Sequence, residues 1–342
     1  IAKADMMLKG DGEEAMHIAF GSTLSNDQHA SRSFDFMLAN PPYGKSWKVD
    51  AEKMASGKKK EILDTRCNGA TEVGEPLAMI PRTSDGQLLF LLNNISKMKQ
   101  DTLLGSRIAE VHNGSSLFTG DAGSGESNAR RFMIENDLVE AIIALPEKMF
   151  YNTGIGTYIW VLSNRKEERR KGKIQLIDAT SIKTPLRKNM GEKNCEFSPE
   201  QREEIVRIFM AFEESEISKI FPNSEFGYWK VSVQQPLLDE QGNPVRDKKG
   251  RIQPDKSKND TEIIPFNYEG GIEGFMDAEV RPYASGAFVD PKGTKIGYEL
   301  SFTKYFYKPV QLRSMEEIVA DLKALEQETD GMLADILGGI QG

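Results

Sequence analysis

The stretch that decides the fold is Phe34-Asp35-Phe36-Met37-Leu38-Ala39-Asn40-Pro41-Pro42-Tyr43-Gly44. Its first half is rich in apolar, strand-forming residues, and we expect a strand over residues 34–39. The strand must end at Asn40, because Pro41 and Pro42 have fixed φ angles and no backbone N–H to donate. A stiff polar corner directly after a buried strand is the central feature of this sequence.

Strand-like and helix-like segments alternate after this corner. Apolar residues at helical spacing predict helices over residues 88–98 and 127–136, whereas the polar stretch 45–75 is typical of a long loop. Runs rich in β-branched residues predict strands over 107–111, 139–145, 157–162 and 173–177. This alternation predicts an α/β fold, in which ligands bind beyond the carboxyl ends of the parallel strands.

Composition sets broad limits on function. The 342 residues are 39% hydrophobic and 28% charged, the balance of a soluble globular protein, with no apolar run long enough to span a bilayer. No basic-then-apolar signal segment opens the sequence, and we expect a cytoplasmic protein without a membrane partner. The net charge of −8 argues mildly against nucleic acid as a partner, although a local cleft or a second subunit can supply positive surface.

Two residue types that often mark sites are sparse. The cysteines, Cys67 and Cys195, are too few for a disulfide framework or a cysteine-based zinc site. The three histidines, His112 among them, lack metal-ligand spacing, and we interpret them as structural or surface residues. We therefore expect no metal site.

Asn40-Pro41-Pro42-Tyr43 suits one particular chemical problem. An exocyclic amine is a poor nucleophile because its lone pair is delocalised into the ring. Two acceptors aimed at its N–H groups, the Asn40 side-chain oxygen and the Pro41 carbonyl, would favour the pyramidal nitrogen and stabilise its developing charge. The Tyr43 ring can stack on the base. A bare tetrapeptide of this kind is also a common surface turn, but its position after a strand favours the site.

Further segments, in order along the chain, carry a resemblance to a known family. The sequence resembles the modification (methyltransferase) subunits of type I restriction–modification systems, which are γ-class adenine-N6 DNA methyltransferases using S-adenosylmethionine. The similar segments are 21–27 (Gly-Ser-Thr-Leu-Ser-Asn-Asp), 34–44, 114–118 with Arg130-Arg131, 138–146, 150–155, 177–179, 297–302 and 305–307.

The resemblance implies a fold and a domain organisation. It implies a Rossmann-like methyltransferase sheet with its N-terminal strands missing, followed by an α-rich C-terminal extension. We expect a catalytic domain over residues 1–180 and the extension over 181–342. A terminal helix over 314–338, with a heptad seam formed by Ile318, Leu322, Leu325, Thr329, Met332 and Ile336, would dock on a partner.

The resemblance also implies roles for individual residues. Asn40, Pro41, Pro42 and Tyr43 would form the adenine site, and Phe150 would stack on the flipped base, with Tyr151 as the fallback if the register slips by one. Phe150 is alternatively an ordinary core aromatic. The implied partners are double-stranded DNA, a specificity subunit that reads the DNA sequence, and a restriction subunit.

The cofactor site departs from the family pattern. The glycine-rich loop that holds S-adenosylmethionine should lie upstream of Ile1, and since the sequence begins without Met we expect a fragment of a longer chain. Gly123-Ser124-Gly125 does not follow a strand and is no substitute. The family commonly places Asp where Ser22 stands. Asp27 is a weaker candidate for contact with the adenine or cofactor edge.

Other readings remain open at the level of sequence. Asn-Pro-Pro-Tyr also occurs in methyltransferases that act on the glutamine amide of release factors, although those chains lack the long extension after residue 180. A non-catalytic DNA-clamping or scaffold subunit is a second alternative. Arg130, Arg131 and the basic run 165–173 fit either phosphate contacts or solvated polar surface, and we favour the latter.

Overall fold

The computed structural model describes residues 1–58, 60–307 and 314–325, in two compact units divided between Phe302 and Thr303. The stretch that decides the fold forms β1 (Phe36–Ala39). Phe34, at the start of the expected strand, makes only an isolated bridge to Met98. As predicted, the strand ends where Asn40 and the prolines begin. The short helices α1 (Ala2–Leu8) and α2 (Gly12–Ala15) precede it.

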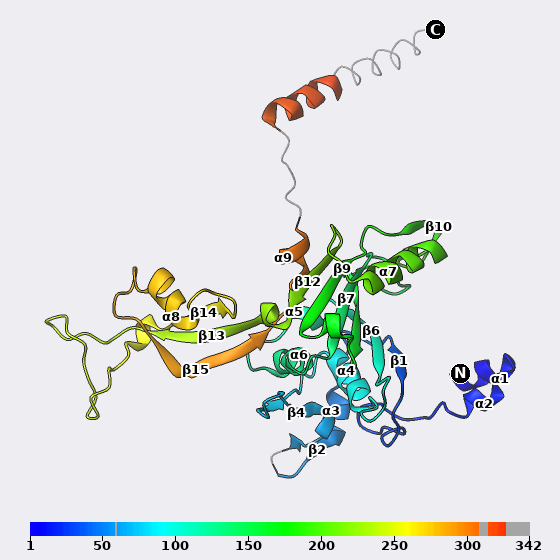
Figure 1. The fold of residues 1–342 in the computed structure, drawn as a ribbon, viewed down its shortest axis with the longest axis horizontal. Coiled ribbons are helices and arrows are strands. Elements are labelled where there is room, and N and C mark those ends of the chain that lie inside the picture. The colour runs from blue at the N-terminus through cyan, green and yellow to red at the C-terminus, as the bar shows by residue number, and fades with distance from the viewer. Residues whose placement is uncertain (59, 308–313, 326–342) are drawn as a thin grey trace, which may run out of the picture. The chain divides into compact units, whose positions relative to one another are not determined.

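A central sheet carries the α/β fold that the sequence predicts. Within the described residues it has six strands in the order β1-β6-β8-β7-β9-β12 (Figure 1). Strands β1 and β6 pair in parallel, as do β7 and β9, whereas β8 and β12 run antiparallel to their neighbours. The carboxyl ends of β1, β6, β7 and β9 therefore meet at one edge. Their bounds are β6 Arg107–Asn113, β7 Val139–Leu145, β8 Thr157–Ser163, β9 Lys173–Asp178 and β12 Ser218–Pro222.

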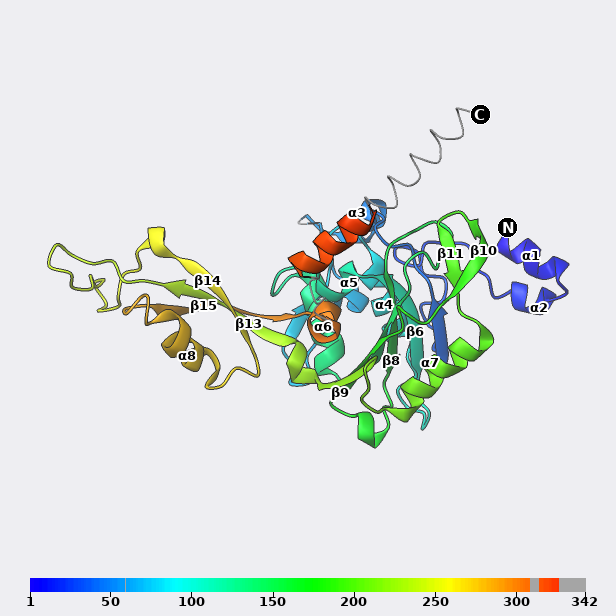
Figure 2. The ribbon, with the colours of Figure 1, turned by 90° about the horizontal axis from the view of Figure 1, so that it is seen from above.

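Helices cover both faces of this sheet (Figure 2). On one face lie α4 (Gln87–Ser96), the short α5 (Ser115–Phe118) and α6 (Gly125–Glu135); on the other lies α7 (Pro199–Ala211). Strand β7 is buried along its whole length because both of its faces are covered, which explains its nearly continuous apolar sequence. Its Ala141, Ile143 and Leu145 pack with Ile205 of α7 in one hydrophobic cluster.

The stretch 45–75, expected to be a long loop, has regular structure. It begins with α3, which is followed by two short strand pairs, β2-β3 and β4-β5. These elements are too short for the periodicity of the sequence to reveal them. Their bounds are α3 Lys48–Met54, β2 Ala55–Ser56, β3 Glu61–Ile62, the 3-10 turn Thr65–Cys67, β4 Asn68–Ala70 and β5 Pro76–Ala78.

The expectation of an α-rich extension after residue 180 is wrong for the described residues up to 307, which hold more strand than helix. The expected boundary at residue 180 falls inside the unit Ile1–Phe302, because β12 pairs with β9 in the central sheet. The extension contains β10 Thr184–Met190, β11 Lys193–Glu196, β13 Gly227–Gln234, β14 Asp260–Pro265, α8 Gly271–Phe275, β15 Phe288–Tyr298 and α9 Phe302–Phe306.

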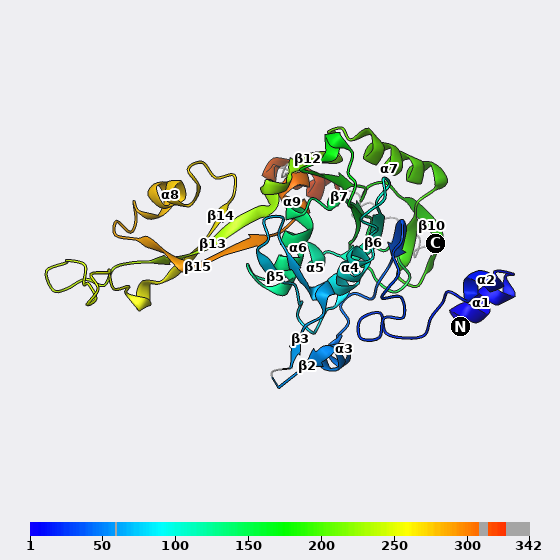
Figure 3. The ribbon, with the colours of Figure 1, turned by 60° about the horizontal axis from the view of Figure 1, so that its bottom comes forward.

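Strands β14, β13 and β15 form a separate antiparallel sheet with its own small core (Figure 3). Val231, Val233, Ile264 and Met276 are its buried centre. This sheet joins the main body through β15, whose Tyr298 carbonyl accepts a hydrogen bond from Arg130 of α6 at 2.6 Å. Between β13 and β14 the charged, Pro- and Gly-rich chain has isolated antiparallel bridges and one 3-10 turn, Lys256–Lys258, in place of longer strands.

Two of the described helices begin with a capping box. Ser198 accepts a hydrogen bond from the Gln201 N–H and caps α7, and the Gln201 side chain accepts one from the Ser198 N–H. In the second unit, Ser314 and Glu317 make the same exchange, and residues 315–325 are helical. The rest of the expected helix 314–338, including Thr329, Met332 and Ile336, lies outside the described residues.

No described helix is long and apolar enough to cross a membrane.

Candidate active site

The predicted site residues come together in one pocket. A cavity of about 500 Å³ is lined by Asn40-Pro41-Pro42-Tyr43 on one side and by Phe150-Tyr151 on the other, with Lys45, Asn152 and Thr153 completing its wall. The first group follows β1, and the second lies in the loop between β7 and β8. Because β1 and β7 run in the same direction, both groups sit at the carboxyl edge of the sheet, where α/β folds bind ligands.

Within the corner, each residue is placed differently. Pro41 is buried and anchors the loop, whereas Asn40 and Pro42 are exposed, so the Asn40 amide is accessible from the pocket. Tyr43 is half-buried, and burial raises the pKa of its phenol above the usual 10.0. Tyr43 is therefore a neutral ring at physiological pH, suited to stacking.

The chain after Tyr43 is held against the segment before α4 by hydrogen bonds and packing, and we call this set of contacts the clasp. Trp47 is almost fully buried; its backbone N–H donates to the Thr83 carbonyl at 3.0 Å, and its indole N–H donates to the Arg82 carbonyl at 2.9 Å. A Cβ at Gly86 would lie 2.9 Å from the Trp47 ring, so glycine permits this close approach. The Gly44 N–H completes the clasp by donating to the Asp85 carboxylate at 3.2 Å.

The same carboxylate links the corner to the next strand of the sheet. Gln87 is buried at the start of α4, and its side-chain N–H groups reach Asp85 (2.7 Å), Asn113 (2.8 Å) and Ser115 (2.8 Å). Asn113 is the last residue of β6. The network therefore fixes the position of the Asn40 corner relative to the end of β6.

The opposite wall of the pocket is held by the β10-β11 hairpin. The Tyr151 carbonyl accepts a hydrogen bond from the Glu192 N–H at 3.0 Å, and the Lys148 carbonyl accepts one from the Asn194 N–H at 3.0 Å. Gly191, at a φ of +64°, lies so close that a Cβ there would be 2.6 Å from the Tyr151 oxygen. Phe150 packs partly against the cluster beneath β7, whereas the Tyr151 side chain is 57% exposed.

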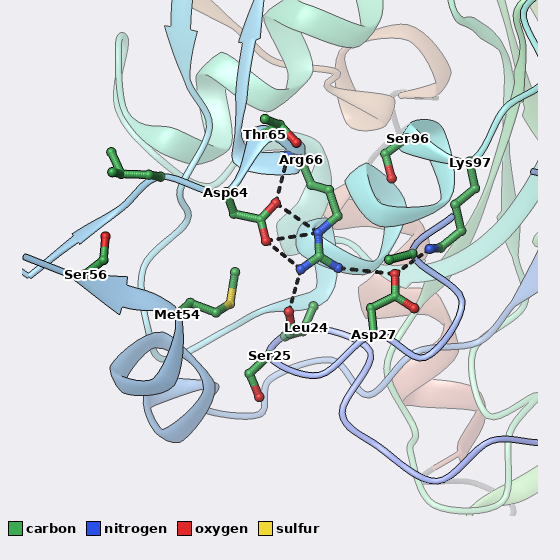
Figure 4. A pocket seen from close by; sticks show the side chains of 12 residues that line it. Leu24, Ser25, Asp27, Met54, Ser56, Asp64, Thr65, Arg66, Ser96 and Lys97 are labelled. Atoms are coloured by element: carbon green, nitrogen blue, oxygen red, sulfur yellow. Dashed lines mark hydrogen bonds and ion pairs between the residues drawn. The ribbon is translucent and has the colours of Figure 1, made fainter. Parts of the chain in front are cut away.

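Asp27 lies in a different hollow, shown in Figure 4. This cavity of about 630 Å³ is larger than the pocket at Asn40, but its charged groups are already paired. Lys97 bonds the Asp27 carboxylate, and Arg66 lies 3.9 Å from it. Arg66 uses its remaining donors on Asp64, Asn93 and the Thr23 and Leu24 carbonyls.

The position of this second hollow separates it from the Asn40 corner. Lys97 ends α4, and its carbonyl accepts a hydrogen bond from the Phe34 N–H at 3.0 Å, near the amino end of β1. Asn40 lies at the other end of that strand. The cofactor role suggested for Asp27 stays a prediction, and its contacts in the structure are those of a group that holds the loop 21–29 against α4.

Arg130 and Arg131 do not form a solvated helix face. Arg130 is fully buried, bonds the Tyr298 and Ser116 carbonyls, and burial lowers its pKa to about 10. Arg131 pairs with Glu75 at 2.5 Å and with Glu135 at 2.8 Å. Both arginines fasten α6 to the segments around it. The interpretation as exposed surface is wrong because β15 and the strand pair β4-β5 cover this helix.

The other polar candidates are structural. His112 is buried, so of the two interpretations, structural or surface residue, the structural one holds for it. Its Nε2 lies 2.9 Å from Glu110. Segment 164–172 connects β8 to β9, but its Lys166 and Arg170 are buried. Both cysteines are buried and free, and no group of three potential metal ligands occurs among the described residues.

Comparison with known proteins now decides the family. Residues 1–230 match the family described as N-6 DNA Methylase. The chain belongs to this family. The match includes β1, the Asn40 corner and the Phe150 loop, so the pocket lies wholly within the family region.

Named relatives are methylase subunits of type I restriction enzymes. The MjaIX methylase subunit of Methanocaldococcus jannaschii is 27% identical over 68% of this chain and 37% of its own length. The MjaVII methylase subunit of the same organism is 31% identical over 53% of this chain and 28% of its own length. The chain thus spans about a third of the length of these curated relatives.

A solved structure shows the same fold. The type I restriction–modification methyltransferase subunit from Streptococcus thermophilus superposes with a TM-score of 0.51 at 23% identity, covering 64% of this chain and 41% of that one. The α/β fold predicted from the alternation of strands and helices, and the methyltransferase sheet implied by the resemblance, are therefore confirmed.

Among the described residues, no glycine-rich loop of the kind expected for S-adenosylmethionine directly follows a strand of the central sheet. β1 is an edge strand, and its Phe36 and Leu38 are 65% and 85% exposed. Gly123-Ser124-Gly125 lies between α5 and α6, not after a strand.

Proposed function

We propose that this chain forms the adenine-binding half of a DNA methyltransferase that methylates N6 of adenine with S-adenosylmethionine as donor. The observation that supports it is the pocket in which Asn40-Pro41-Pro42-Tyr43 faces Phe150-Tyr151. Two fixed oxygens and aromatic rings around one cavity suit a planar base with an exocyclic amine. Membership of the N-6 DNA methylase family supports DNA as the substrate class.

The role proposed for each residue follows from its position in the pocket. The Asn40 side-chain oxygen and the Pro41 carbonyl accept hydrogen bonds from the target amine and stabilise positive charge on its nitrogen. Tyr43 stacks on one face of the base, and Phe150, with Tyr151 as the alternative, on the other. The base must leave the duplex because its N6 amine is paired inside, and stacking in the pocket offsets part of the cost of unstacking.

The donor supplies the methyl group when bound, and we propose that its glycine-rich loop is not among the described residues. Asp27 is retained only as a secondary candidate for donor contact, since Lys97 already pairs with it. The chain's own contribution is to bind, orient and polarise the acceptor. Binding and polarising the amine in this way does not require a general base held at a particular position in the pocket.

We further propose that the protein works in a type I restriction–modification assembly in the cytoplasm, with a specificity subunit and a restriction subunit. The relatives named as type I methylase subunits support this assembly. In the helix at 315–325, Ile318, Leu322 and Leu325 are exposed, which suits docking on a partner helix.

The test is a methyl-transfer assay on the intact assembly with labelled S-adenosylmethionine, offering duplex DNA and release-factor protein together. Labelled N6-methyladenine in the DNA is the expected product. Label on protein glutamine would identify the release-factor chemistry instead, and absence of transfer with intact cofactor binding would favour a scaffold.

A further inference from the structure

The β10-β11 hairpin combines two properties that the proposed function does not yet use. It is anchored on the wall of the base pocket, through the backbone bonds from Glu192 to Tyr151 and from Asn194 to Lys148. It also has a small excess of basic residues: residues 183–196 contain four Lys or Arg and two acidic residues. In a chain of net charge −8, this positive charge lies on the hairpin whose turn contacts the pocket wall.

The basic side chains of the hairpin are available for a ligand. Lys183, Arg187 and Lys188 are exposed, and among the described residues no carboxylate forms a salt bridge with any of them. Lys193 lies over the Tyr151 ring, 5.2 Å from its centroid. Lys193, which also lies 3.6 Å from Glu196, thus contacts a pocket aromatic, whereas Lys183, Arg187 and Lys188 are the exposed cations without a salt bridge among the described residues.

Two other basic segments contain salt bridges of their own. In the irregular segment between β13 and β14, Arg251 pairs with Asp247 at 2.7 Å and Lys258 lies 3.7 Å from Asp255. In the connection from β8 to β9, Arg169 pairs with Glu167 at 2.8 Å. Lys45, which lines the pocket, is a single exposed cation, whereas three exposed cations lie in or directly before β10, in the hairpin whose turn contacts the pocket wall.

We propose that the β10-β11 hairpin binds the phosphodiester backbone of DNA beside the adenine that enters the pocket. This inference rests on the proposed function. A flipped base swings about its own backbone, so the adjoining phosphates must lie at the pocket rim. Contacts from Arg187 and Lys188 would fix those phosphates and set the register of the strand without reading its sequence.

The test compares two double variants of the intact assembly, Arg187→Gln/Lys188→Gln and the control Lys248→Gln/Lys249→Gln. Both remove two exposed positive charges, the second pair in the turn at 247–251. DNA affinity is measured as salt rises from about 50 to 200 mM. The hairpin variant should bind specific and non-specific duplexes more weakly, and its salt slope should fall by about two, about one per lost phosphate contact. The control should keep the wild-type slope.

Equal slopes for the hairpin variant and the wild type would overturn the inference, as would equal losses in both variants, which would indicate an effect of net charge alone. Methyl transfer at saturating DNA separates the inference from the function on which it rests. The hairpin variant should reach the wild-type maximal rate at higher DNA concentration. If the wild-type assembly transfers no methyl group, the function fails, while the salt slopes still decide whether the hairpin binds DNA.

Discussion

The backbone N–H of Gly44 donates a hydrogen bond to the carboxylate of Asp85 at 3.2 Å. This contact joins the loop that follows Tyr43 to the residue two positions before α4, and through Gln87 to the end of β6. The Asn40 corner is thus fixed by the sheet on one side and by this clasp on the other. Rigid placement matters because the acceptor oxygens must already be aligned when the amine reacts.

Replacing Asp85 with alanine should slow methyl transfer without unfolding the chain. Gly44 and Gln87 both lose their acceptor, and a shift of about 1 Å in the corner would cost roughly 100-fold in rate. The maximal rate in single-turnover assays of the intact assembly checks this, with DNA affinity expected to stay near the wild type. Glu240→Ala, in the exposed segment after β13, is the matched control and should be fully active. A normal maximal rate in Asp85→Ala would show that the clasp does not position the corner.

The aromatic wall can be tested with a fluorescent base. If Phe150 stacks on the flipped base, Phe150→Leu should remove stacking worth roughly 1–3 kcal/mol while keeping an apolar side chain against the cluster beneath β7. The fluorescence of 2-aminopurine at the target position reports the loss of stacking. Tyr151→Leu serves as the comparison. A larger effect at Tyr151 than at Phe150 would assign the stacking role to the fallback residue.

The pairing of Asp27 with Lys97 predicts a specific dependence of stability on pH. Burial opposes ionisation of Asp27, but hydrogen bonds from Lys97 and the His29 N–H outweigh it and lower the pKa below the usual 3.8. A lowered pKa means that the stabilisation is present above about pH 4 and is lost as the pH falls through the folded-state value. Lys97 would be left as an unpaired buried charge in Asp27→Asn.

Urea unfolding of the wild type and Asp27→Asn between pH 7 and pH 3 measures this effect. At pH 7 the wild type should be more stable by about 3 kcal/mol, and the difference should shrink below about pH 4. Equal stabilities at neutral pH, together with weaker cofactor binding by the variant in the intact assembly, would restore Asp27 as a ligand contact.

Glu140 should be the most costly carboxylate to neutralise. It is buried in β7, 3.1 Å from Arg107 and 3.5 Å from Arg170, whose side chain is itself buried against Phe209. Glu140→Gln leaves the Arg170 charge uncompensated, and we expect a loss of roughly 3–5 kcal/mol in the free energy of unfolding. Glu167→Gln, an exposed ion-pair member, is the control and should not shift the urea midpoint. A midpoint for Glu140→Gln equal to that of the control would contradict the buried-pair interpretation.

Local sequence patterns predicted the structure correctly where each pattern is typical of one kind of element. The apolar run before Asn40 and the leucines of α4 predicted their elements correctly because periodicity acts over a few residues. The likeness of 150–155 to a family segment likewise led to the Phe150 wall. The burial of single side chains by distant segments was predicted wrongly: Arg130 looked like surface because β15, which covers it, lies about half the chain away in sequence.

The supports of the site were missed for the same reason. Trp47, Asp85 and Gln87 each look unremarkable in sequence, and only the fold brings the Arg82–Gly86 segment against the corner. One signal was present: Gln87 stands directly before the apolar run Leu88–Leu92 of α4. The hairpin on Tyr151 gave no local signal, because backbone carbonyls make its contacts and any sequence supplies those.

The most direct test is methyl transfer to DNA adenine by the intact assembly carrying Asn40→Ala, compared with Asn40→Asp. Alanine removes the side-chain acceptor, whereas aspartate keeps an oxygen at the same place. We predict that Asn40→Ala abolishes transfer, that Asn40→Asp retains a measurable part of it, and that both bind DNA like the wild type. An Asn40→Ala assembly that methylates adenine at the normal rate would show that this corner is only a turn.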